Sequence, residues 1–237
     1  TLAANTITVG TGAWSKFSGP AGSFSNTASP TSTFTPSGPG TYVLRWTATN
    51  LSCTFFDDMT LTVDPLPTTS NAGTPFSVCQ FQPVSLNGNV PTVGTGLWTQ
   101  VSGPTAAVFA DATSPTTAVF GTQEGAYVFK WTITSGSCNA SSSNVTVPIN
   151  ELPPLADAGV DQTICNTSTA TLSGNNPGIA TGTWTFVSNA GNTATITNPN
   201  LFNTTVTGIS TGTTRLKWTI SNGSCSPYSD EVQITKP

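Results

Sequence analysis

Short stretches of the chain alternate strictly between apolar and polar residues. In the clearest stretch, residues 126–134, one face carries Tyr127, Phe129, Trp131 and Ile133, and the other carries Val128, Lys130 and Thr132. Alternation with period two, rich in aromatic and β-branched residues, is typical of a β-strand with one buried face. Similar stretches at residues 83–87, 96–102, 116–120 and 144–149 are separated by Gly, Pro, Asn and Ser clusters. No window shows helical periodicity, so the pattern predicts an all-β fold.

The same pattern occurs three times. A first tryptophan recurs at Trp14, Trp98 and Trp184, a second at Trp46, Trp131 and Trp218, and a cysteine at Cys53, Cys138 and Cys225. These markers are 84 to 87 residues apart. Several markers with one spacing indicate tandem copies of a single structural unit.

Proline-bearing segments separate the copies, at residues 64–67 and 151–154. The predicted units are therefore residues 1–67, 68–153 and 154–237. Because proline restricts the backbone to extended conformations, such short joints act as semi-rigid spacers, and we expect an elongated rod. Leu2 aligns with Leu86 and Leu172, so the first unit lacks an opening segment that contains Cys79 in the second unit and Cys165 in the third. We expect the chain to be an excerpt from a longer array.

About seven short strands per unit favour an antiparallel β-sandwich of the immunoglobulin type. The six tryptophans lie on apolar alternations in all three units, so we expect them to fill the space between the sheets. The alternative is a platform on which sugars stack. Core packing is the better interpretation, because large aromatic side chains are mostly buried.

The amino-acid composition argues against several classes of function. The chain has no histidine, six Lys and Arg, ten Asp and Glu, and a net charge of −4. Nucleic acids and anionic membranes bind clustered Lys and Arg, so neither is an expected partner. Without histidine the commonest general base and metal ligand are missing, and no phosphate loop, metal motif or nucleophile elbow appears. The sequence therefore predicts no enzyme, no cofactor and no membrane insertion.

Residues 98–104, Trp-Thr-Gln-Val-Ser-Gly-Pro, resemble a segment of PKD-like repeats, and residues 14–20 follow it closely. The Ala-Asp-Ala-Gly opening at residues 156–159 and the Gly-x-Tyr strand agree with this family. With two cysteines per unit, the chain is similar to tandem repeats of giant secreted adhesins of gliding bacteria. The resemblance implies an extracellular location on a bacterial surface, type IX export, and a stalk role in cell adhesion or gliding motility.

Regularly spaced cysteines in a chain that resembles secreted proteins imply structural disulfides among Cys53, Cys79, Cys138, Cys165 and Cys225. One scheme closes each unit through Cys79–Cys138 and Cys165–Cys225. In an immunoglobulin-type sandwich, however, the expected positions of these cysteines lie about 17–20 Å apart, whereas a disulfide tolerates about 7 Å between Cα atoms. The other scheme joins neighbouring units through Cys79–Cys225 and leaves the other three cysteines for units outside this chain. Both schemes remain open at this point.

Charged side chains offer few binding sites. Arg45, Lys130 and Lys217 occupy one strand position in successive units, either as solubilising charges or, less favoured, as a ligand-binding stripe. Carboxylates cluster at Asp57-Asp58, Asp157 with Asp161, and Asp230-Glu231. Calcium at the joints between units is conceivable, but solvated carboxylates are the better interpretation, because the set does not repeat.

The sequence thus predicts a non-catalytic stalk segment whose partners are neighbouring units of the same longer chain. One alternative is a module that binds surface polysaccharide or a protein. Because the low charge gives little repulsion between rods, lateral self-association is a further possibility. The missing opening segment of the first unit also allows an extracellular filament in which a donated strand completes the sandwich.

Overall fold

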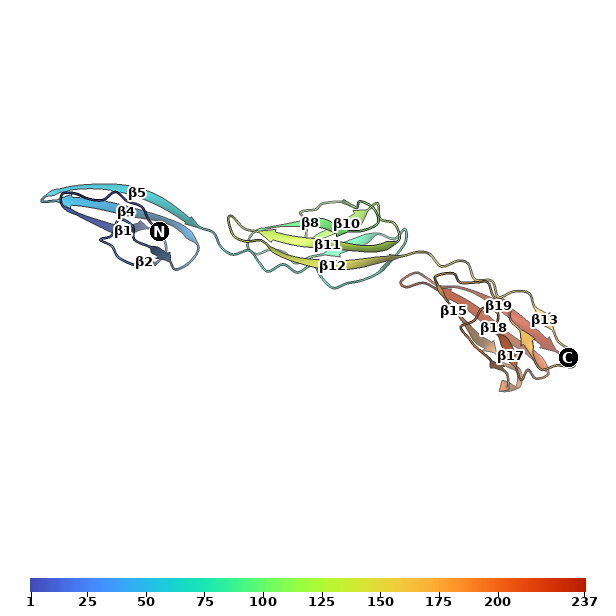
Figure 1. The fold of residues 1–237 in the computed structure, drawn as a ribbon. Coiled ribbons are helices and arrows are strands. Elements are labelled where there is room, and N and C mark those ends of the chain that lie inside the picture. Colours follow the sequence, from blue (N-terminus) through green and yellow to red (C-terminus); the bar gives the residue numbers. More distant parts are fainter.

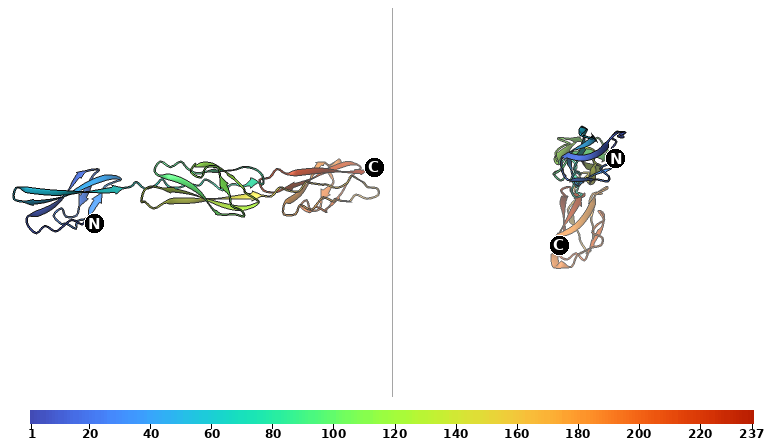
Figure 2. Two further views of the ribbon diagram at one scale, coloured as in Figure 1. Left: turned by 90° about the horizontal axis from the view of Figure 1, so that it is seen from above. Right: turned by 90° about the vertical axis from the view of Figure 1, so that its left-hand side faces the viewer.

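The computed structural model describes residues 1–237, except for the side chain of Asn192. It consists of three β-sandwiches arranged end to end in chain order, with the C-terminus at the far end of the rod (Figures 1 and 2). We call them unit 1, unit 2 and unit 3 in chain order. The predicted all-β, immunoglobulin-like fold is confirmed, and the one helical element is a single 3-10 turn, η1 (Ala190–Asn192).

Each unit is built from antiparallel strands in two layers. Unit 1 contains β1 (Thr11–Ser18), β2 (Gly22–Phe24), β3 (Phe34–Pro36), β4 (Gly40–Asn50) and β5 (Cys53–Val63). Its sheets have the orders β1-β4-β5 and β2-β3.

Units 2 and 3 each have two strands more than unit 1, an opening strand and one further strand in the second sheet. Unit 2 contains β6 (Val78–Cys79), β7 (Val84–Asn87), β8 (Thr95–Ser102), β9 (Val108–Phe109), β10 (Thr116–Phe120), β11 (Gly125–Thr134) and β12 (Ser141–Asn150). Its sheets have the orders β6-β12-β11-β8 and β7-β10-β9.

Unit 3 repeats the arrangement of unit 2 with β13 (Gln162–Thr163), β14 (Ala170–Thr171), β15 (Thr181–Ser188), β16 (Thr195–Ile196), β17 (Thr205–Thr207), β18 (Gly212–Ser221) and β19 (Tyr228–Lys236). Its sheets have the orders β13-β19-β18-β15 and β14-β17-β16. The opening strands β6 and β13 pair in parallel with the closing strands β12 and β19.

Each unit has its own hydrophobic core, centred on its two tryptophans. The two indoles of a unit are cross-strand neighbours, with ring centroids 5.3 Å apart for Trp14 and Trp46. The corresponding separation is 5.1 Å for Trp98 with Trp131 and for Trp184 with Trp218. All six tryptophans are buried, so they face the interior of the sandwiches rather than a sugar.

A glycine two positions before the first tryptophan makes room for the second one. A Cβ atom on Gly12, Gly96 or Gly182 would overlap the indole of Trp46, Trp131 or Trp218. The recurring Gly-x-Trp sequence is therefore a packing requirement, because the indole ring occupies the space above the glycine backbone.

We predict that Gly12→Ala destabilises unit 1 by about 1–3 kcal/mol, since the added methyl group overpacks the core. Gly38→Ala in the same unit is the matched control, because a Cβ there meets nothing within 4 Å. Urea unfolding followed by tryptophan fluorescence measures both variants. Equal midpoints for the two variants would contradict the proposed role of Gly12.

Candidate functional site: the junctions between the units

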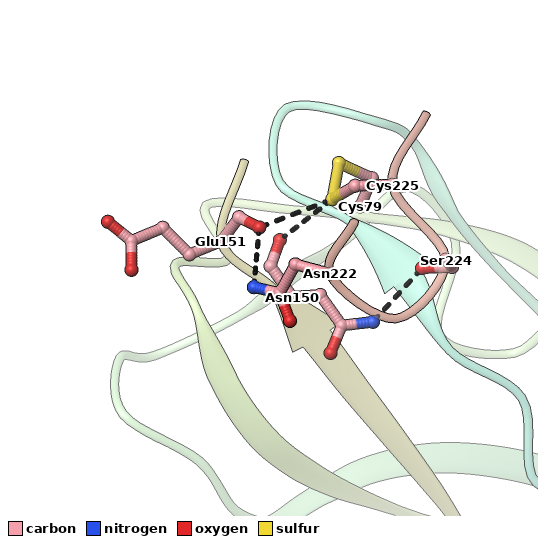
Figure 3. The surroundings of a disulfide bond; sticks show 6 residues. All are labelled: Cys79, Asn150, Glu151, Asn222, Ser224 and Cys225. Carbon is pink, nitrogen blue, oxygen red and sulfur yellow. Dashed lines mark hydrogen bonds between the residues drawn. A yellow bond between two sulfur atoms is a disulfide. The ribbon is translucent and has the colours of Figure 1, made fainter. Parts of the chain in front are cut away.

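The junctions between neighbouring units contain a disulfide and several side-chain hydrogen bonds that connect one unit to the next. At the junction of units 2 and 3, the turn at residues 222–225 packs against the end of β12 and against β6 (Figure 3). Asn222 donates a hydrogen bond from Nδ2 to the carbonyl oxygen of Glu151 at 2.9 Å. Asn150 donates from its own Nδ2 to the hydroxyl of Ser224 at 3.1 Å. These contacts fix the end of one unit against the head of the next.

A disulfide between Cys79 and Cys225 crosses this junction, with 4.7 Å between the Cα atoms. The Cys225 sulfur also lies 3.5 Å and 3.4 Å from the carbonyl oxygens of Asn150 and Glu151. The sequence separation of the two cysteines is 146 residues. In the chain-entropy account, a loop of this size stabilises the folded state by about 5 kcal/mol.

Of the two pairing schemes, the structure contains the one that joins units, and it pairs neither Cys79 with Cys138 nor Cys165 with Cys225. The reason is geometric. The opening segment of unit 2, residues 68–79, runs the length of the sandwich, so Cys79 and Cys138 lie at opposite ends. Within the described residues Cys53, Cys138 and Cys165 are free thiols, and these are the three cysteines that the unit-joining scheme leaves without a partner in this chain.

The junction of units 1 and 2 has the same design without a disulfide. The carboxylate of Asp64 accepts hydrogen bonds from the backbone N–H of Ser137 at 2.7 Å and from its hydroxyl at 2.9 Å. The thiol of Cys138 lies 3.6 Å from the carbonyl oxygen of Asp64. Asp64 and Cys138 therefore occupy the places that Asn150 and Cys225 occupy at the other junction.

Glycine makes both junctions possible. Gly136 and Gly223 have positive φ angles of 48° and 52°. A Cβ atom at Gly136 would overlap the carboxyl group of Asp64, and one at Gly223 would overlap the amide of Asn150. Glycine is favoured at both points because it adopts this conformation and leaves room for the docked side chain.

Docking changes the acidity of Asp64. The backbone N–H of Ser137 and then its hydroxyl stabilise the ionised carboxylate and lower its pKa from the ordinary 3.8. Because docking lowers the pKa of Asp64, the contact stabilises the folded protein at pH values above the ordinary pKa of the carboxyl group. This stabilisation is lost as the pH falls through the lowered pKa.

The three cations at one strand position have three different surroundings. Arg45 binds Asp58 through two hydrogen bonds of 2.7 and 2.8 Å and lies between the rings of Phe17 and Phe56. Lys130 lines an open groove of about 810 Å³ on the outer face of unit 2. Lys217 lies opposite Glu231 in the sheet. These surroundings do not form a repeated ligand-binding stripe.

Two carboxylates that we expected to be solvated, Asp161 and Asp230, are exposed or half-buried and also accept hydrogen bonds from backbone groups. Asp230 accepts a hydrogen bond from the N–H of Ala158 at 2.8 Å, and Asp161 accepts one from the N–H of Gln233 at 2.8 Å. Both bonds attach the opening segment of unit 3 to its closing strand β19. Throughout the described part of the chain, no three His, Cys, Asp or Glu side chains gather as a possible metal site.

Sequence reasoning placed Asp64 in the first joint but did not predict its docking on Ser137, and it did not identify Asn150 or Asn222 as docking residues. A signal for them exists, because Gly-Ser-Cys recurs at residues 136–138 and 223–225. Among the described residues, no helix is long and apolar enough to cross a membrane.

We predict that peptide mapping without reductant recovers a peptide pair joined through Cys79 and Cys225. The bond should persist in mild glutathione buffer, because the folded junction holds the two Cα atoms within bonding distance. Recovery of a Cys79–Cys138 pair from the folded chain would contradict the structure.

We further predict that Ser137→Ala raises the pKa of Asp64 part of the way towards its ordinary value, because one of two donors is lost. Carboxyl ¹³C NMR titration measures this shift. Asp111 is the internal control, because its pKa is lowered by the hydroxyl and N–H of Thr113 and should not respond. An unchanged Asp64 titration in the variant would show that Asp64 is not docked on Ser137.

Comparison with known proteins identifies the type of module that these junctions connect. Residues 72–149 match the family described as "K319L-like, PKD domain". The titin fragment I67–I69, in an E-to-A mutated variant, is similar with a TM-score of 0.51 and 13% identity over 95% of this chain and 87% of that chain. Domains 3–5 of the extracellular part of Drosophila OTK give a TM-score of 0.51 and 12% identity over 84% of this chain and 71% of that chain.

The PKD domain of the KIAA 1837 protein is 26% identical over 35% of this chain and 86% of that chain, with a TM-score of 0.32. No curated protein matches the chain. The two three-domain structures support the fold alone. The chain is therefore a tandem array of immunoglobulin-like β-sandwiches, and its middle unit matches a PKD domain family.

Proposed function

We propose that this chain is a non-catalytic, load-bearing stalk segment of a secreted bacterial surface adhesin, of the kind used in cell adhesion or gliding motility. Immunoglobulin-like and PKD modules are typically structural rather than catalytic. A disulfide between units suits an oxidising location outside the cell. In this role the neighbouring units are the main partners, and they hold a distal binding region away from the cell.

The observation that carries this proposal is the covalent route along the rod. Residues 68–79 run along unit 2 from its first junction to its second, where β6 lies parallel to the end of β12. Residues 225–237 then run along unit 3 towards its far end, marked C in Figure 2. The Cys79–Cys225 bond joins these two extended segments directly.

Tension along the rod therefore bypasses most of units 2 and 3. The residues between the two cysteines, 80–224, form a closed loop that contains the greater part of both cores. A pull on the two ends of the chain loads the extended segments and the disulfide, not this loop. Such a stalk resists lengthening even when a sandwich opens under load.

A binding role has weaker support. A sugar-binding surface would call for aromatic side chains that recur on one outer face. Phe17 is exposed on unit 1, but Val101 and Val187 occupy the matching positions three residues after the first tryptophan of units 2 and 3. The stalk is therefore the function that we put forward.

Pulling the chain by its termini tests the stalk. We expect the oxidised protein to release little length from units 2 and 3, because residues 80–224 are closed off by the disulfide. Reductant should release about 500 Å more, the extended length of 145 residues at roughly 3.3–3.6 Å each.

A Cys79→Ser variant is the matched control and should show the longer extension without reductant. Single-molecule force spectroscopy measures each length. Equal extensions with and without reductant would rule out the load-bearing route.

A further inference from the structure

Unit 2 contains a single cation, Lys130, which is the only Lys or Arg between residues 68 and 153. Its side chain lies on the outer face of β11, is half-buried and lines a groove of about 810 Å³. Within the described residues its ammonium group forms no ion pair and no hydrogen bond. The groove therefore contains a positive charge that no carboxylate of the described chain neutralises.

The three units differ at the residue that faces this cation across the sheet. Asp58 faces the cation of unit 1 and binds it through two hydrogen bonds. Glu231 faces the cation of unit 3. In unit 2 the facing residue is Asn144, which has no charge. The position that carries a carboxylate in units 1 and 3 is thus neutral in the unit that has the groove.

The carboxylates of unit 2 lie elsewhere. Asp111, Glu124 and Glu151 are all outside its strands, and none of them lines the groove. Asp111 belongs to the turn at the rim, where it accepts hydrogen bonds from the N–H of Thr113 at 2.9 Å and from its hydroxyl at 2.7 Å. An anion that enters the groove is therefore attracted by Lys130 and meets no acidic side chain on the groove wall.

The groove has an apolar surface beside this charge. It extends over the outer faces of β8 and β11, between the loop at residues 90–94 and the turn at residues 113–115. Pro91 and Pro115 line its two sides, and Leu97 of β8 is 46% exposed within it. Its volume lies in the range of about 300–1,000 Å³ that is usual for small-molecule sites.

Polar groups without partners lie next to the cation. In the pairing of β8 with β11, Lys130 lies opposite Thr99, and Thr132 lies opposite Leu97. Side chains paired across strands in this way have Cβ atoms about 5 Å apart. The hydroxyls of Thr99 and Thr132 have no hydrogen-bond partner in the part of the chain that the structure describes. One ammonium group, two hydroxyls and one leucine thus form a continuous patch.

This combination matches the chemistry of an acidic sugar. A hydroxyl both donates and accepts hydrogen bonds, as the hydroxyls of a sugar do. The C–H face of a sugar ring is apolar and can pack on a leucine. A sugar carboxylate supplies the negative charge that Asn144 does not, and a hydrogen bond between ammonium and carboxylate is stronger than one between neutral groups.

An extended peptide or a nucleic acid fits this groove less well. β8 is the edge strand of its sheet, but the N–H of Trp98 in its middle donates to the carbonyl oxygen of Ala112 at 2.8 Å. A peptide therefore cannot pair along the whole edge, which is how extended peptides add to a sheet. Nucleic acids require several cations, and the groove has one.

We propose that the groove of unit 2 binds a segment of an acidic oligosaccharide. The carboxylate of one sugar accepts a hydrogen bond from Lys130, sugar hydroxyls bond to Thr99 and Thr132, and the ring packs on Leu97. This is one site on the middle unit, not the recurring aromatic surface considered above. It goes beyond the stalk function and does not rest on it.

The test titrates the full chain, labelled with ¹⁵N, with tetrasaccharides of galacturonic acid, of mannuronic acid and of hyaluronan. We expect at least one of them to bind and to shift the amide signals of Thr99, Lys130 and Thr132 most. Its methyl ester keeps the hydroxyls but loses the charge and should bind about tenfold more weakly. Added salt should also weaken binding of the acid, because the charges are partly exposed.

The variants separate the cation from the rest of the groove. Lys130→Gln should lower the affinity for the acidic tetrasaccharide about tenfold. Lys217→Gln, at the same strand position of unit 3, is the matched control and should bind as the unaltered chain does. Leu97→Thr introduces the residue type of Thr183 in unit 3 and should weaken binding about fivefold, because apolar contact is lost. Circular dichroism establishes that the variants remain folded.

Absence of binding by all three acidic tetrasaccharides would overturn the proposal. So would equal binding of the acid and its methyl ester, or equal binding by the Lys130→Gln and Lys217→Gln chains. Hexaglutamate tests the acidic-peptide alternative, and binding at this groove as tight as that of the sugars would overturn the assignment to a saccharide. None of these results bears on the force measurement, which follows the disulfide between units 2 and 3.

Discussion

The structure of units 2 and 3 depends on one constraint: an extended segment that enters each unit before its first core strand covers the inner face of the closing strand. In unit 2 this segment buries Ala72 and half-buries Val78 over the tryptophan core. Since the segment must span the whole sandwich, it carries its cysteine to the far end, next to the following unit. The position of the disulfide and the covalent route along the rod follow from this single path.

Similar hydrogen bonds connect neighbouring units at both junctions, but only the junction of units 2 and 3 also has a disulfide. A side chain at the end of the closing strand, Asp64 or Asn150, docks on a Gly-Ser-Cys turn of the next unit. The glycine gives the turn its positive φ angle and the space for that side chain. The proline-bearing joint between units is short and semi-rigid, and these polar contacts add fixed points of attachment between the sandwiches.

Much of the fold could be predicted from the sequence, because aromatic residues at alternate positions, such as Tyr127, Phe129 and Trp131, indicate strand and burial together. The recurring tryptophans also revealed the repeat. The disulfide pairing could not be settled, since Cys79 has two partners at plausible spacing and only the path of residues 68–79 distinguishes them. The roles of Asp230 and Asp161 were missed because a carboxylate that binds a backbone N–H has no characteristic spacing in sequence.

The distance in sequence between Cys79 and Cys225 has a consequence for biogenesis. A chain made from its N-terminus at about 5–20 residues per second exposes Cys79 for roughly 7 to 29 seconds before its partner emerges. During that interval Cys138, 59 positions later, is already present as a competing thiol. In the folded unit 2 these two sulfurs lie at opposite ends of the sandwich and cannot be coupled. Selection of Cys225 over Cys138 by Cys79 is therefore favoured when unit 2 folds before its thiols are oxidised.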